Sequence, residues 1–205
     1  MSNFNLVICM PMYWDSILGY NLTSLKNQRI TFHEKIKEYI NLRYPTIKIL
    51  EIRDSTQPNI YEGQTLYWLW EKSKQINCNL LYLHSKGISN YSPTGTTDNW
   101  RQILDYFLIE NWHKNLSHLD NNDVMGLRDA ISNDFVMSGN CWWSNSSYIQ
   151  KLPNPLETNS YYPQPENLQR YCYERWVTTN NPKIHYMVDT KTNHYNDYCF
   201  LENLI

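Results

Sequence analysis

The chain has 205 residues and a formal net charge of −2, with its lysines and arginines scattered along the sequence. That length is sufficient for one sizeable hydrophobic core. The near-neutral charge gives no electrostatic basis for binding nucleic acid or an anionic membrane surface, and no stretch is long and apolar enough to span a bilayer. We therefore expect a globular protein that binds no nucleic acid and has no membrane span.

The first half of the chain alternates between strand-like and helix-like patterns. The apolar run 5–10, which Pro11 ends, predicts a central strand. Thr31 and Glu34 have the spacing of a capping box and open a predicted helix over 31–44. The next predicted elements are a strand over 46–54, a helix over 63–76 and a strand over 78–84.

The second half continues this alternation. After the polar loop 89–97, Asp98 is a favourable N-cap for a long amphipathic helix over 99–119. The remaining predicted elements are a strand over 123–128, a strand with a glycine break within 134–144, a short helix over 145–153, a helix over 166–180 and a strand over 183–187. Such alternation predicts a single α/β domain with a mainly parallel central sheet flanked by helices.

Cysteine usage and the N-terminal sequence indicate a compartment. The five cysteines are widely spaced and form no CxxC pair, which disfavours a structural zinc site and suits free thiols in a reducing environment. The first apolar run has no basic region before it and is too short for a signal peptide. We therefore expect a cytoplasmic protein.

Polar turns directly follow four of the predicted strands. They are Pro11–Asp15, Arg53–Asp54, His84–Gly87 and Arg128–Asp129. In open α/β sheets, ligands bind beyond the carboxyl ends of the strands. The sequence therefore predicts a ligand site at these four turns.

Five stretches between Leu80 and Val177 carry a family resemblance. They read LYLHSKG, NWRQILDYFLIENW, VMGLR, SGNCWWSNSSYIQKLP and YCYERWV. In this order and spacing they resemble a group of GT-A-type glycosyltransferases found in bacterial polysaccharide loci and large DNA viruses. The resemblance implies a GT-A-like single domain over 1–205, with a nucleotide-binding part over about 1–130 and an acceptor-side part over about 131–205.

The resemblance also implies an activity. Such an enzyme transfers a hexose or deoxyhexose from a UDP-, GDP- or dTDP-linked donor to a glycan or glycoprotein acceptor. If the chain is viral, we expect it to act in the host cytoplasm. The alternative function is a non-catalytic sugar- or nucleotide-binding module on the same scaffold.

The chain departs from the wider GT-A pattern at the end of its third predicted strand. It has no Asp-X-Asp motif, and His84, Ser85 and Lys86 stand where that motif is expected. The departing nucleotide diphosphate needs a positive charge beside it. Either Lys86 supplies that charge without a metal, or Mn²⁺ or Mg²⁺ supplies it, held by His84 together with His194. His84 could instead hydrogen-bond a phosphate. The alternative without a site is that His84 is a strand-end histidine with its hydrogen bonds satisfied and Lys86 a solvated turn residue.

The further candidate donor ligands are Pro11, Tyr13, Asp15, Arg53 and Arg101. Pro11 ends the first strand, and beyond it Tyr13, or alternatively its neighbour Trp14, could stack on the nucleotide, while Asp15 could accept a hydrogen bond from the ribose or from uracil. Arg53 closes the second strand and could contact the nucleotide. Arg101 lies in the first turn of the long helix, where a cation opposes the helix dipole, and this suggests a bound anion. The alternatives are core packing for the aromatic ring, a helix cap for the aspartate, and ion pairs for the arginines.

The candidate acceptor ligands are Ser138, Gly139, Asn140, Trp142 and Trp143. A glycine lets the backbone approach a ligand closely, and an asparagine amide both donates to and accepts from sugar hydroxyls. Successive strand residues point to opposite faces of a sheet. We therefore expect at most one of the two tryptophans in the core, with the other available to stack on a sugar.

A carboxylate is needed to deprotonate the acceptor hydroxyl if transfer inverts the sugar configuration. Glu174, within YCYERWV, is the first candidate for this catalytic base, and Asp134 is the second. The alternative for Glu174 is an ordinary surface position on a helix. A retaining enzyme needs no such base, and the residues do not decide between the two outcomes.

Overall fold

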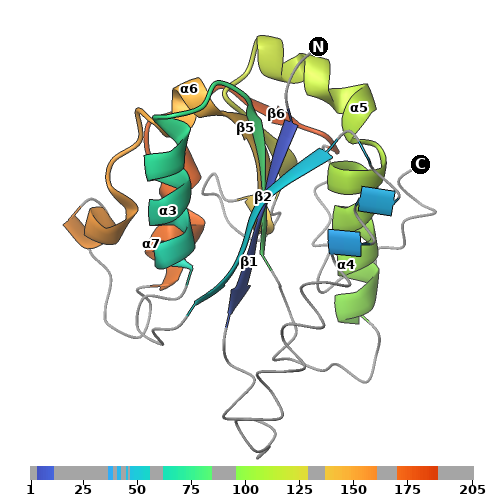
Figure 1. Ribbon diagram of the computed structural model, residues 1–205, viewed down its shortest axis with the longest axis horizontal. Helices are drawn as coiled ribbons and strands as arrows, with labels where there is room; N and C mark the ends of the chain where they lie inside the picture. The colour runs from blue at the N-terminus through green and yellow to red at the C-terminus, as the bar shows by residue number, and fades with distance from the viewer. Residues whose placement is uncertain are drawn as a thin grey trace, which may run out of the picture.

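The computed structural model describes residues 4–11, 37–38, 41–42, 45, 47–55, 62–84, 96–128, 137–160 and 170–188. For residues 4–11, 47, 49–55, 84, 96–99, 101, 158–160 and 170, the description covers the backbone alone. Figure 1 shows these residues as a central sheet with helices on both sides.

The described strands form one six-stranded sheet. They are β1 (Phe4–Pro11), β2 (Ile47–Ser55), β3 (Asn79–His84), β4 (Val124–Arg128), β5 (Met137–Asn145) and β6 (Ile184–Tyr186), in the spatial order β2-β1-β3-β5-β4-β6. β1 is parallel to β2 and β3, and β4 is parallel to β6. β5 is antiparallel to both of its neighbours, β3 and β4.

The sheet is therefore mixed. The predicted α/β class is confirmed, but the prediction of a mainly parallel sheet is wrong. The reason is the short connection between β4 and β5, which consists of residues 129–136. A parallel pair needs a crossover of about a dozen residues or more. The chain reverses instead, so β5 begins at the edge of the sheet where β4 ends.

The described helices fall into two groups in the sequence. Those before β4 are α3 (Gly63–Ser73), α4 (Thr96–Asp105), the π-helix η1 (Tyr106–Glu110), α5 (Trp112–Asn115) and the 3-10 helix η2 (Leu116–Asp120). Those after β5 are α6 (Ser146–Ile149), the 3-10 helix η3 (Pro155–Ser160), α7 (Arg170–Glu174) and the 3-10 helix η5 (Trp176–Thr178). No helix among the described residues is both long and apolar enough to cross a membrane.

A π-helical turn interrupts the helix that was predicted over 99–119. The Asn111 N–H donates to the carbonyl of Tyr106, five residues back, at 2.9 Å. Within this turn, the carbonyl of Leu108 accepts a 2.8 Å hydrogen bond from the indole of Trp143 in β5. Helical periodicity alone could not predict this contact, because Trp143 is 35 residues away in the sequence.

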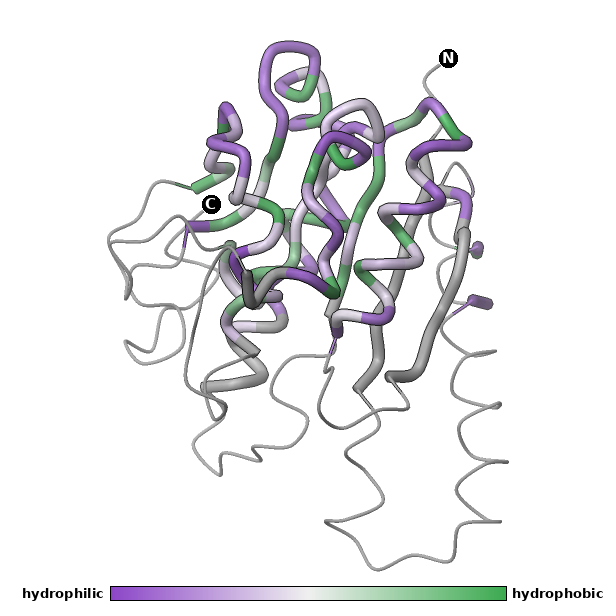
Figure 2. The backbone as a smooth tube through the Cα atoms, turned by 90° about the vertical axis from the view of Figure 1, so that its left-hand side faces the viewer, coloured by the Kyte–Doolittle hydropathy of each residue, from purple (hydrophilic) through white to green (hydrophobic). Residues whose placement is uncertain are grey.

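Buried hydrophobic side chains form two clusters, one with α4 and one with α3, and Figure 1 shows these two helices on opposite sides of the sheet. The α4 cluster comprises Leu81, Trp100, Ile103, Leu104, Phe107, Leu108, Leu116, Leu119, Met125, Leu127, Cys141 and Trp143. The α3 cluster comprises Leu66, Leu69, Cys78, Leu80, Tyr82, Val124, Met137, Trp142, Tyr148, Ile149, Leu152, Trp176 and Val177. In Figure 2, hydrophobic green segments recur along the strands and helices of this core. Both faces of the sheet are therefore buried.

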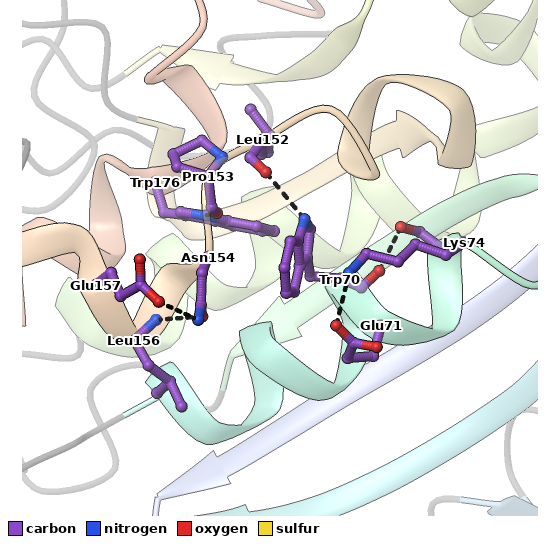
Figure 3. Close-up of polar contacts among 10 residues, drawn as sticks. Trp70, Glu71, Lys74, Leu152, Pro153, Asn154, Leu156, Glu157 and Trp176 are labelled. Atoms are coloured by element: carbon purple, nitrogen blue, oxygen red, sulfur yellow. Dashed lines mark hydrogen bonds and ion pairs between the residues drawn. The ribbon is translucent and has the colours of Figure 1, made fainter.

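Two indole hydrogen bonds link α3 and η5 to the backbone of Leu152 and Pro153, beside the α3 cluster (Figure 3). Trp70 of α3 donates to the carbonyl of Leu152 at 2.9 Å, and Trp176 of η5 donates to the carbonyl of Pro153 at 2.8 Å. The ammonium of Lys74 lies 3.2 Å from the centroid of the Trp70 ring. The segment that precedes η3 is thereby fastened to α3 and to η5.

Candidate functional site at the carboxyl edge of the sheet

The carboxyl ends of β1, β2 and β3 lie side by side. Arg53 of β2 pairs with Cys9 of β1, which in turn pairs with His84 of β3. Pro11 pairs with Ser55 at the end of β2. Since neighbouring strands are about 4.8 Å apart, the backbones of Arg53 and His84 are separated by roughly 10 Å. Three predicted donor positions, Pro11, Arg53 and His84, therefore share this edge.

β5 brings the candidate acceptor segment to the same edge. It is antiparallel to β3, and Tyr82 pairs with Trp142. His84 lies two residues after Tyr82, and Asn140 lies two residues before Trp142, so both lie toward the carboxyl edge of β3. The chain thus brings His84 and the segment that begins at Ser138 to one place.

Other candidates lie outside the described residues. They are Tyr13, Asp15, Ser85, Lys86, Asp134 and His194. Arg101 lies on α4, where the description covers its backbone alone. The roles given to these residues stay predictions.

β5 departs from the regular ladder in a bulge, which comprises Ser138–Cys141. Gly126 of β4 pairs with Trp142, whereas Arg128, two residues further on, pairs with Met137. One residue of β4 therefore faces the four residues of the bulge. Bulges of this kind re-aim side chains and are frequent beside active sites.

The bulge contains two consecutive residues in the left-handed region. Gly139 has a φ of 68° and Asn140 a φ of 51°. Asparagine is among the few non-glycine residues that tolerate this conformation. A Cβ atom on Gly139 would lie 3.0 Å from Leu104 and 3.2 Å from Trp100, both on α4. The space beside this glycine is therefore occupied by α4, and the role of Gly139 in acceptor binding stays a prediction.

Trp142 and Trp143 are both completely buried. The prediction that one of them is available to stack on a sugar is therefore wrong. They belong to opposite clusters, as strand alternation requires, but helices cover both faces of the sheet. Trp142 stacks on Tyr82 with ring centroids 5.0 Å apart, and Trp143 is held by the carbonyl of Leu108.

Two hydrogen bonds fix the side chain of Asn140. The indole of Trp142 donates to its Oδ1 at 3.1 Å, and its Nδ2 donates to Oε1 of Glu62 at 3.2 Å. Asn140 is 2% exposed and Glu62 is 5% exposed. The amide that was predicted to bind acceptor hydroxyls is thus engaged at both ends inside the protein.

Ser138 is engaged in the same way on the other face of the sheet. Its Oγ accepts a 2.8 Å hydrogen bond from the indole of Trp100 on α4, and its side chain is buried. The bulge is therefore fastened to α4 through Ser138 and to the start of α3 through Asn140. As a group, the side chains predicted to contact the acceptor hold the backbone of the bulge in place.

Glu62 is not among the site residues predicted from the sequence. It directly precedes α3, and its backbone carbonyl accepts hydrogen bonds from the N–H groups of Thr65 and Leu66. A signal was present, because a loop that follows a strand and precedes a helix lies at the carboxyl edge in such sheets. The acidic residue immediately before Gly63 was therefore a candidate by position.

Glu174, the first candidate for the catalytic base, is the last residue of α7 and is half-buried. α7 packs against η3 and η5 and lies on the α3 side of the sheet (Figure 1). Its role as the catalytic base stays a prediction.

Among the described residues, no group of three or more His, Cys, Asp or Glu side chains could hold a metal ion. His118 of η2 and His185 of β6 do stack, with ring centroids 3.7 Å apart and planes inclined by 11°. An imidazole ligates a metal in its ring plane, so two parallel stacked rings do not aim at one ion. Burial, and secondly the neighbouring His118, lower the pKa of His185.

A family model matches residues 23–185, and its description is "Domain of unknown function (DUF8361)". The chain belongs to this family. The matched range contains Glu62, α3, His84 and the whole of the β5 bulge, whereas Pro11 and the rest of β1 precede it. No curated protein and no solved structure matches the chain.

Proposed function

We propose that this chain is a glycosyltransferase that moves a hexose or deoxyhexose from a nucleotide-sugar donor to a glycan or glycoprotein acceptor. The observation that carries the proposal is the meeting of two predicted segments at one edge. His84, where the donor diphosphate is expected, ends β3, and the bulge of β5 begins beside it. Ligands of open α/β sheets bind at this edge.

The fold supports the proposal in its coarse form. A mixed α/β sheet with helices on both faces is compatible with the GT-A-like architecture that the motifs resemble. Asn140 has a backbone conformation in the left-handed region, and the Glu62 carboxyl group is buried beside the bulge. Both features cost conformational or desolvation free energy, and features of this kind cluster at functional sites.

The chemistry requires stabilisation of the leaving diphosphate. As the glycosidic bond breaks, its electron pair stays with the diphosphate oxygen, and a cation beside that oxygen lowers the barrier. Lys86 follows β3 by two residues and is the residue to which we assign this role. A divalent ion bound near His84 is the alternative source of charge, and it would polarise the same oxygen.

The main rival is a sugar-binding module without catalysis. Binding modules often hold sugars on exposed aromatic rings. The burial of Trp142 and Trp143 removes the stacking surface that the sequence offered for such a module. Because the same tryptophans were the candidate acceptor ligands of the transferase, their burial does not separate the two functions, whereas turnover of a donor does.

Hydrogen–deuterium exchange tests where a donor binds. UDP-, GDP- and dTDP-linked hexoses would be added one at a time, with and without Mn²⁺. We expect one of these donors to slow exchange in the peptides that contain the ends of β1 and β3 and the start of β5. Peptides from η2 and the start of β4, at the opposite edge, serve as the internal control. Protection confined to that opposite edge, or absent with every donor, would contradict the proposal.

A further inference from the structure

Glu62 and Asn140 join two parts of the chain that are 78 residues apart in sequence. Glu62 leads into α3, and Asn140 lies in the left-handed part of the β5 bulge. Both side chains are at least 95% buried. A hydrogen bond between a carboxylate and an amide at such a position is stronger and more costly to break than the same bond at the surface.

The orientation of the Asn140 amide is determined by chemistry. The indole of Trp142 can only donate, so the atom of Asn140 that faces it must be the oxygen. The amide nitrogen consequently faces Glu62, which accepts through Oε1. Reversal of the amide would place two donors against each other and leave the carboxylate without this donor.

This fixed amide acts on the backbone of the bulge. The φ of 51° at Asn140 is uncommon for a residue with a side chain, and it persists only where surrounding contacts hold it. The bond to Glu62 ties this residue to the beginning of α3. The bond to Trp142 ties it to the α3 cluster.

We infer that Glu62 is a positioning residue, whose carboxylate acts through Asn140 to hold the β5 bulge in its left-handed conformation at the carboxyl edge. The structural part of this inference concerns the bulge alone. Its consequence for sugar transfer rests on the proposed function.

Exchanging the carboxylate and the amide between positions 62 and 140 tests whether their hydrogen bond holds the bulge. Asn140→Asp places a second carboxyl group about 3 Å from Glu62 in a buried site. The two charged forms repel strongly, and a shared proton could bridge their oxygens, so each variant is compared with the wild type at neutral pH and at alkaline pH, where that proton is lost. Glu62→Gln combined with Asn140→Asp exchanges the carboxylate and the amide. The glutamine Nε2 then donates to the aspartate, and the aspartate still accepts from Trp142.

The chain offers a matched control on its surface. Asn154 donates through Nδ2 to Oε1 of Glu157 at 2.9 Å, as Asn140 does to Glu62 (Figure 3). This pair is exposed, so water screens the repulsion that Asn154→Asp introduces. We therefore expect Asn154→Asp to leave exchange in the bulge unchanged.

Amide hydrogen exchange at 138–142 is the primary measurement. We expect Asn140→Asp to accelerate it by about tenfold or more, and the double variant to return it to within about threefold of the wild-type rate. If Asn140→Asp fails to fold, recovery of a folded protein in the double variant supports the inference equally. Unaltered exchange in Asn140→Asp at alkaline pH, relative to the wild type at the same pH, or a double variant no better than Asn140→Asp there, would overturn it.

Donor turnover separates a positioning role from one in folding alone. At a temperature where all variants are folded, we expect kcat to fall in Asn140→Asp and to recover in the transposed variant. If kcat is equal in the wild type, Asn140→Asp and the double variant while their exchange rates differ, Glu62 stabilises the bulge but positions nothing for sugar transfer. That result would overturn its positioning role. If the wild type turns over no donor while exchange follows the expected order, the proposed function fails and the role of Glu62 in the bulge stands.

Discussion

Replacement of Lys86 by alanine is expected to lower kcat for sugar transfer by about 100-fold or more. Removal of a single group that stabilises developing negative charge typically costs a factor of about 10²–10³. Lys86 is assigned this role because it follows the end of β3 in a chain without an Asp-X-Asp motif. Initial rates of nucleotide release at saturating donor, with and without Mn²⁺, measure the effect.

Lys151→Ala is the control for this experiment, because Lys151 is exposed and follows α6, beyond the opposite end of β5. It removes the same charge from the protein without altering the carboxyl edge. We expect its kcat to equal that of the wild type. A folded Lys86→Ala variant with nearly full activity would refute the assignment of Lys86. If Mn²⁺ restores the activity of Lys86→Ala, the stabilising charge would be assigned to a metal ion near His84 instead of to Lys86.

Trp142→Ala is expected to lower the free energy of unfolding by about 3–5 kcal/mol, the usual cost of truncating a buried tryptophan. Trp142 is fully buried, stacks on Tyr82 and lies 6.5 Å from Trp176 between ring centroids. The alanine would leave a large cavity in the α3 cluster and would remove the hydrogen bond to Asn140. Equilibrium unfolding in urea, monitored by far-ultraviolet circular dichroism, gives the change.

Trp142→Phe separates the two contributions. It retains most of the apolar volume but lacks the indole N–H, so Asn140 loses a donor. We expect a smaller loss of stability than in Trp142→Ala, together with faster exchange in the bulge. A loss below about 1 kcal/mol in Trp142→Ala would be incompatible with the packing of this residue in the core.

The strands were predictable where a local pattern determines them. The apolar runs at β1 and β3 are unbroken, and β1 ends at Pro11 while β3 ends at His84. That pattern was sufficient to place His84 and Pro11 together. It did not predict the reversed direction of β5, although the short connection from β4 was visible in the sequence and a parallel crossover needs about a dozen residues or more.

The environment of the bulge was not predictable from local patterns. Strand alternation correctly predicts that Trp142 and Trp143 point to opposite faces of the sheet. It does not predict whether helices cover those faces. The partner of Asn140 is Glu62, and that of Ser138 is Trp100, so both contacts join distant parts of the chain. Periodicity reports on neighbours along an element, whereas these bonds depend on how α3 and α4 pack on the sheet.

Turnover of a nucleotide sugar is the most direct test of the proposed activity. The purified protein would be incubated with UDP-, GDP- and dTDP-linked hexoses and deoxyhexoses, with and without Mn²⁺ and glycan acceptors, and release of free nucleotide would be measured. We predict that one donor class releases nucleotide above its spontaneous rate and that Lys86→Ala abolishes most of this release. Binding of a nucleotide without turnover of any donor would contradict the transferase and identify a binding module.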